Sequence, residues 1–77
     1  PEMKVTLKLA GAFVYAAGFS HKELDVQPGT TIADILETLA IDGGRPMVIA
    51  RNGHGVGPDE EVRAGDRILV SPVFSGG

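Results

Sequence analysis

The residues best placed for chemistry lie at the C-terminal end of the chain, in the run SPVFSGG at residues 71–77. Pro72 lacks a backbone N–H, so we expect it to end the hydrogen-bonded ladder of a preceding strand. Residues 73–77 would then project as an arm of roughly 15–18 Å if extended. Two glycines make the tip of this arm thin enough for a narrow channel, where any Cβ would collide with the walls. The pattern favours a Gly77 carboxylate held out to the α-phosphate of a nucleotide, and the alternative is an inert, frayed end.

Three other groups of polar residues have plainer interpretations. Residues 53–57, GHGVG, lack the glycine spacing, the lysine and the following helix of a phosphate-binding loop, so they predict a turn. The two histidines, His21 and His54, have neither cysteines nor acids at ligand spacing, so no metal site is expected. The acidic run 59–61 consists of adjacent residues that would not converge on one substrate, which indicates a solvated turn.

Size and charge narrow the classes of function further. A chain of 77 residues forms one domain and lacks the bulk to build a concave catalytic site, so we do not expect an enzyme that acts alone. The absence of cysteine excludes disulfides, thiolate metal sites and cysteine catalysis. A net charge of -3 argues against nucleic acid and anionic membranes as partners, since both favour a basic patch.

The apolar runs also bear on location. They are far shorter than a membrane-spanning helix, and residues 1–4 lack the hydrophobic stretch of a signal peptide. The sequence therefore predicts a cytoplasmic protein with no membrane partner.

The elements that must position the arm are visible as changes of hydrophobic period. Residues 4–9, KVTLKL, and 21–26, HKELDV, alternate polar and apolar side chains and predict two strands. Residues 10–20 between them contain glycines and small residues, so a loop or a wide hairpin connection is expected. Two strands joined locally favour an antiparallel hairpin.

Residues 30–39 change to the helical period. Four aliphatic residues recur at i, i+3, i+4 and i+7, namely Ile32, Ile35, Leu36 and Leu39. Thr31 and Asp34 have the spacing of a capping box at the start of this helix. The pair Gly43-Gly44 and then Pro46 mark where the helix must have stopped.

The second half returns to strands. Residues 46–50 form a short apolar run typical of a strand covered on both faces, and Asn52-Gly53 predicts a tight turn. Residues 55–62 form a polar connection with room for a short edge strand. Residues 67–72, RILVSP, predict the last strand.

This order predicts an α+β fold of the β-grasp, or ubiquitin-like, type: a mixed sheet of four to five strands with one main helix packed across it. A right-handed crossover after the helix would return the chain parallel to the first strand. The expected division is a β-grasp domain over residues 1–72 and a projecting C-terminal arm over residues 73–77 that ends in Gly-Gly.

The chain resembles the MoaD/ThiS family of sulfur carriers, and the resemblance spans nearly its whole length. The residues that carry it are 63–77, where a Gly-Asp strand runs into Pro-Val and a terminal Gly-Gly, with Asn52-Gly53 and residues 28–36 before them. Phe74 makes the arm one residue longer than the usual Pro-Val-(Ala/Ser)-Gly-Gly ending of the family. This departure bears on the choice of partner and not on the chemistry.

The resemblance implies that an E1-like enzyme uses ATP to adenylate Gly77, and that sulfur then replaces AMP to give a thiocarboxylate. The protein itself would be the carrier, a small subunit of a sulfur-transfer enzyme and not an enzyme on its own, and it would bind no cofactor. The residues expected to contact the partners are Val73, Phe74, Ser75 and Gly76. The favoured recipient of the sulfur is the large subunit of molybdopterin synthase, in the biosynthesis of molybdenum or tungsten cofactor.

Three alternatives remain at this point. The sulfur could serve thiamin thiazole or another metabolite, the terminus could form an isopeptide bond to lysine as in a ubiquitin-like modifier, or the protein could be a plain interaction module.

Overall fold

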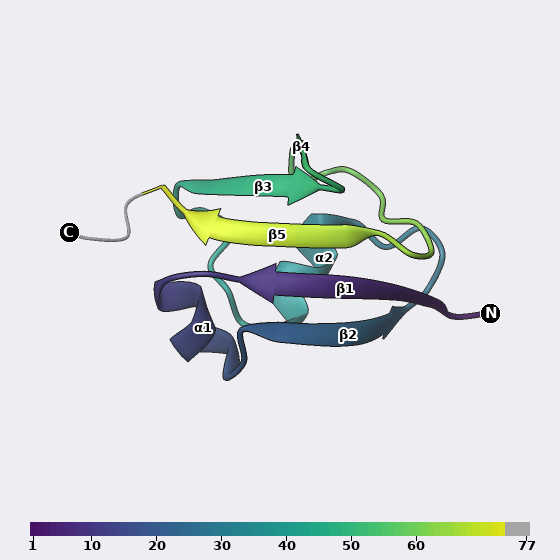
Figure 1. Cartoon of the computed structure of the whole chain (residues 1–77), viewed down its shortest axis with the longest axis horizontal. Helices are drawn as coiled ribbons and strands as arrows, with labels where there is room; N and C mark the ends of the chain where they lie inside the picture. The colour runs from purple at the N-terminus through teal and green to yellow at the C-terminus, as the bar shows by residue number, and fades with distance from the viewer. Residues whose placement is uncertain (74–77) are drawn as a thin grey trace.

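The computed structural model of the chain describes residues 1–73, and over these residues it contains one five-stranded mixed sheet and two short helices (Figure 1). In chain order the elements are β1 (Met3–Leu9), α1 (Ala12–Ala17), β2 (His21–Val26), α2 (Ile32–Thr38), β3 (Met47–Arg51), β4 (His54–Gly55) and β5 (Arg67–Pro72). The strands lie in the order β2-β1-β5-β3-β4. The expected α+β class, with one main helix across a mixed sheet, is confirmed.

The pairing of the strands places β5 at the centre of the sheet. β1 and β2 pair antiparallel as expected, while β5 pairs parallel with β1 and antiparallel with β3. The expectation that the strand after the helix would lie parallel to the first strand is therefore wrong. The central place goes to β5 because its side chains Ile68 and Val70 are almost completely buried, whereas β3 contributes only Ile49 to the buried core.

Helix α2 begins as the sequence predicts. The backbone N–H of Asp34 donates to Thr31 Oγ1 at 3.1 Å, and the Thr31 N–H donates to Asp34 Oδ2 at 3.0 Å, which is the full capping box. Three of its aliphatic residues are buried against the sheet and Leu39 is half-buried at the C-terminal end. The helix ends before the glycine pair, because Ala40 adopts a left-handed conformation with φ 59°.

The segment between β1 and β2 differs from the expectation. The predicted loop is wrong, since residues 12–17 form helix α1, which follows Gly11 and ends at Gly18. The Gly18 N–H donates to Val14 O at 2.8 Å in a left-handed cap with φ 86°. Burial of Phe13 in the core holds this helix against the end of the sheet.

The core lies between the sheet and the two helices. Its buried members are Val5, Leu7, Leu9, Phe13, Ile32, Ile35, Leu36, Ile41, Ile49, Val62, Ile68 and Val70. The short edge strand expected within residues 55–62 is instead the two-residue β4, and Glu61 makes only an isolated bridge with Thr31. The polar connection still contributes Val62 to the core.

Candidate docking surface and C-terminal arm

The C-terminal arm leaves the sheet from its central strand. β5 ends at Pro72, as the sequence predicts, and the Val73 N–H donates a long hydrogen bond of 3.4 Å to Pro46 O. The Val73 side chain is 52% exposed. The other predicted site residues, Phe74, Ser75, Gly76 and Gly77, lie outside the described residues.

The face of the sheet opposite α2 is open, and Figure 1 views the molecule from this side, with α2 behind the strands. Leu69 and Val48 are 42% and 54% exposed there. Leu69 lies beside Lys8 of β1 on one side and Ala50 of β3 on the other. Part of the exposed surface of the central strands is thus apolar, on the strand that leads to Val73.

The same face is hollowed and carries positive charge. A depression of about 490 Å³ is lined by Thr6, Lys8, His21, Ala50, Gly53, Arg67, Ile68 and Leu69. Two of these side chains are cationic and none is acidic, although the whole chain has a net charge of -3. We call Lys8, Val48, Arg67 and Leu69 the open-face patch. An apolar surface bordered by cations fits a partner that offers apolar side chains and carboxylates.

A hydrogen-bonded cluster fixes the start of β5. Asp66 is only 7% exposed, and its carboxylate accepts hydrogen bonds from the Arg63 N–H at 2.8 Å and from Asn52 Nδ2 at 3.1 Å. The Asn52 Oδ1 in turn accepts from the Arg67 N–H at 2.8 Å. Arg51 Nε lies 4.0 Å from the same carboxylate, so the buried charge has a partner. This cluster sets the position of the Arg67 backbone, at one end of the open-face patch.

At the β2 side of the open face, one lysine forms ion pairs with two acidic side chains. Lys4 Nζ donates to Asp25 Oδ1 at 2.8 Å and lies 3.8 Å from Glu23 Oε1. The hydrogen bond to Asp25, together with the charge of that carboxylate, raises the pKa of Lys4 above its usual value. This corner of the sheet therefore keeps an excess of negative charge.

The structure also places the GHGVG run and the acidic run that the sequence analysis considered. Asn52 and Gly53 both have positive φ, 52° and 86°, so the GHGVG run begins in a tight turn. Glu60 of the acidic run pairs with Arg51 at 3.2 Å. Within residues 1–73 no group of three or more potential metal-ligating side chains converges.

No helix in this part of the chain is long and apolar enough to cross a membrane.

The sequence predicts an exposed apolar patch on the sheet face opposite the helix, continued by Val73 and Phe74, but it does not name the residues of the sheet that form the patch. Alternation along β5 places Arg67, Leu69 and Ser71 on one face and buries Ile68 and Val70 on the other. Leu69 departs from this simple alternation, because it is an apolar residue at an outward-facing position. The charged residues on β1 could be assigned to this face only once the parallel pairing of β1 and β5 was known.

Comparison with solved structures supports the fold. The protein is similar to small archaeal modifier protein 1 (SAMP1) from Haloferax volcanii, with 26% identity, a TM-score of 0.74, and coverage of 96% of this chain and 99% of that chain. It is also similar to a putative molybdopterin converting factor, subunit 1, from Pyrococcus furiosus, with 27% identity, a TM-score of 0.73, and coverage of 91% and 97%. The ubiquitin of Caldiarchaeum subterraneum shares the fold over the full length of both chains, with 21% identity and a TM-score of 0.62. No curated protein sequence matches the chain.

The sheet order, the helix across one face and these likenesses define a β-grasp, ubiquitin-like protein. The model of the ThiS family matches residues 7–77, and the chain belongs to that family. It is therefore a small ubiquitin-fold protein of the group that contains sulfur carriers and ubiquitin-like modifiers, a carrier and not a catalytic enzyme.

Proposed function

We propose that this protein carries sulfur as a thiocarboxylate on Gly77. The proposal rests on a Gly-Gly end that follows the central strand of a ThiS-family chain by only a few residues. In the first step the Gly77 carboxylate attacks the α-phosphate of ATP, and pyrophosphate leaves as the acyl-adenylate forms. In the second step the terminal sulfur of a persulfide in the activating system attacks the acyl carbon and AMP leaves. A second thiol of that system then attacks the inner sulfur of the resulting acyl disulfide, so that a disulfide forms and the thiocarboxylate is released. The chain has no cysteine, so no side-chain thiol of its own competes for the activated acyl group.

An E1-like enzyme supplies the adenylation site and consumes the ATP. The open-face patch is the docking surface for this enzyme and for the acceptor, because it lies on the strand that leads into the arm. Leu69 and Val48 provide apolar contact area, while Lys8 and Arg67 pair with carboxylates of the partner. The arm, residues 73–77, then reaches into the partner as a separate functional segment, with residues 1–72 as the folded domain.

The acceptor we favour is the large subunit of molybdopterin synthase. Support comes from the likeness to the molybdopterin converting factor subunit 1 of Pyrococcus furiosus, at 27% identity over 91% of this chain. Thiamin thiazole synthesis or another small-metabolite pathway is the alternative acceptor system for the same thiocarboxylate.

A second function, as a protein modifier, has an observation of its own in its favour. The modifier protein of Haloferax volcanii is similar at 26% identity over 96% of this chain. In this case the activated Gly77 carbonyl would be attacked by a lysine amine, and AMP or a carrier thiol would leave as an isopeptide bond forms.

Intact-mass analysis tests the proposal. The protein is incubated with its E1-like enzyme, ATP and a sulfur donor, and the expected gain equals the difference between one sulfur and one oxygen, localised to Gly77. Two variants serve as controls, Gly76→Val and a chain with one residue added after Gly77. Both should keep the fold and lose ATP–pyrophosphate exchange. Normal exchange in either variant would show that the terminus is not the reactive group.

Discharge of the loaded protein separates the acceptors. With the molybdopterin precursor and the large synthase subunit, the mass should return to its starting value. Discharge only by a thiazole-forming system would keep the sulfur-carrier function and exclude the molybdopterin assignment. A mass gain found only in lysine conjugates would establish the modifier function instead.

A further inference from the structure

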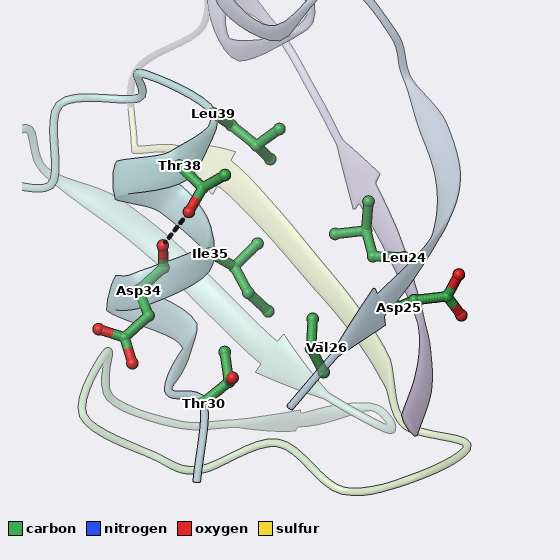
Figure 2. Close-up of a pocket in the computed structure, with 8 residues that line it drawn as sticks. All are labelled: Leu24, Asp25, Val26, Thr30, Asp34, Ile35, Thr38 and Leu39. Atoms are coloured by element: carbon green, nitrogen blue, oxygen red, sulfur yellow. Dashed lines mark hydrogen bonds between the residues drawn. The ribbon is translucent and has the colours of Figure 1, made fainter. Parts of the chain in front are cut away.

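A groove on the other side of the molecule lies between α2 and β2. It has a volume of about 290 Å³ and is lined by Leu24, Asp25, Val26, Thr30, Asp34, Ile35, Thr38 and Leu39. Figure 2 shows the aliphatic side chains of Leu24, Ile35 and Leu39 lying toward the space between helix and strand, while the Asp25 carboxylate points away from it. The floor of the groove is therefore apolar and its walls are formed by a helix and an edge strand.

β2 is the long free edge of the sheet, since the opposite edge is the two-residue β4. The Leu9 N–H donates to Ser20 O, whereas the Thr6 and Ala10 N–H groups point to the β5 side and bond to Asp66 O and Val70 O. In an antiparallel ladder, residues two apart along a strand direct their backbone groups to the same side.

This alternation assigns the backbone groups of β2. Lys22, Leu24 and Val26 bond toward β1, so the N–H and C=O groups of His21, Glu23 and Asp25 point away from the sheet. Within residues 1–73, none of the backbone hydrogen bonds between elements uses these three residues. The edge beside the groove thus offers free donors and acceptors over three alternate positions.

The charges on β2 indicate what could lie beside it. Glu23 and Asp25 project on the open face from this same edge and share a single cation, Lys4. A strand added next to β2 would place its own outward side chains directly across from these two acids, where opposite charges are favourable. A second copy of this chain would instead bring its own Glu23 and Asp25 to the edge, and like charges would meet.

We propose that β2 and the groove bind an extended segment of a partner protein in which aliphatic and basic residues alternate. The segment pairs antiparallel with β2 as a sixth strand, with main-chain hydrogen bonds to His21, Glu23 and Asp25. Its aliphatic side chains enter the groove against Leu24 and Leu39, and its lysines or arginines face Glu23 and Asp25. The acids of this surface border the open face, but its groove lies on the other face of the sheet from the open-face patch, and the proposal is independent of the function proposed for Gly77.

A capped synthetic peptide, Thr-Val-Lys-Ile-Lys-Val-Thr, is the probe. NMR titration of the full-length protein should show saturable shifts at the amides of residues 21–26 and in α2. Amide hydrogen exchange should slow at His21, Glu23 and Asp25 in the complex, which simple apolar binding in the groove would not produce. A peptide N-methylated at both lysines should bind at least tenfold more weakly, because it lacks the N–H donors that face β2. The peptide with glutamates in place of the lysines should also bind at least tenfold more weakly.

Two isosteric variants with equal charge change test the contact on the protein side. Glu23→Gln removes the charge opposite the peptide lysine and should weaken binding about two- to fivefold. Glu37→Gln makes the same change on an exposed position of α2 outside the groove and should alter binding by less than a factor of 1.5. Both variants keep the backbone of β2 and the cap of α2 intact.

Three results would overturn the proposal. The first is absence of saturable binding by the basic peptide at millimolar concentration, and the second is binding that shifts Val48 and Leu69 instead of β2. The third is amide hydrogen exchange at Glu23 and Asp25 that becomes slower as the protein concentration rises, with no peptide present. A second copy of the chain would then be the occupant of the edge.

Discussion

Asn52 Nδ2 donates a hydrogen bond of 3.1 Å to Asp66 Oδ1, and this contact joins the turn between β3 and β4 to the residue that precedes β5. The same asparagine tolerates the left-handed conformation with φ 52° and accepts from the Arg67 N–H. One side chain therefore shapes the turn and sets the start of the strand that leads to the arm.

Two substitutions separate these roles of Asn52. Asn52→Gly keeps the left-handed conformation but removes both side-chain hydrogen bonds, so we expect a loss of about 1.5–3 kcal/mol in the free energy of unfolding. Asn52→Ala should lose about 1 kcal/mol more, because alanine is strained at positive φ. Urea denaturation measures both values. Equal stability of the two variants would show that the backbone conformation contributes nothing.

The end of α2 offers a stabilising substitution. Ala40 has φ 59° and is exposed, so Ala40→Gly should relieve left-handed strain and raise the free energy of unfolding by about 0.5–1 kcal/mol after the entropic cost of glycine. The matched control is Ala33→Gly within the helix, where the same change should destabilise the protein by about 0.5–1 kcal/mol. If Ala40→Gly also destabilises, the left-handed cap is not strained.

The open-face patch predicts a binding defect without a folding defect. Leu69→Ala removes an apolar contact at the centre of the face and should weaken binding to the E1-like enzyme about tenfold, as measured by titration calorimetry. Because Leu69 is 42% exposed, the free energy of unfolding should change by less than about 1 kcal/mol. Tyr15→Ala removes an even more exposed side chain, at 90%, from α1 and should leave binding unchanged. Equal effects of both variants would argue against a localised surface.

An aromatic residue in the arm is expected to anchor the partner. Phe74→Ala should weaken binding by about 2 kcal/mol, which is about thirtyfold in Kd, while the melting temperature stays nearly constant. Thermal unfolding followed by circular dichroism is the companion measurement. A variant that unfolds would place Phe74 in the core and contradict its role in docking.

Local signals in the sequence predicted the local parts of the fold. Thr31 and Asp34 are three residues apart and form the capping box that their spacing predicts. Asn52-Gly53 forms the expected tight turn because both residues accept positive φ. Each of these features depends on a few neighbouring residues, so one sequence suffices to find them.

The missed parts depend on contacts between distant residues. Helix α1 has only six residues and is held by the burial of Phe13, which no periodicity over so short a segment reveals. The parallel partner of β1 was assigned to the wrong strand because the choice depends on which strand buries most side chains in the finished sheet. The sequence alone assigns no site role to Asp66, and only the structure shows it beside Asn52 and Arg51.

The central position of β5 also has a mechanical consequence. β5 is bonded to β1 on one side and to β3 on the other, and the inter-strand hydrogen bonds lie across the strand direction. A pull applied at Val73 along the axis of β5 therefore loads both ladders in shear, so that many bonds share the force at once and do not open one after another. The domain therefore resists tension best along the axis of β5.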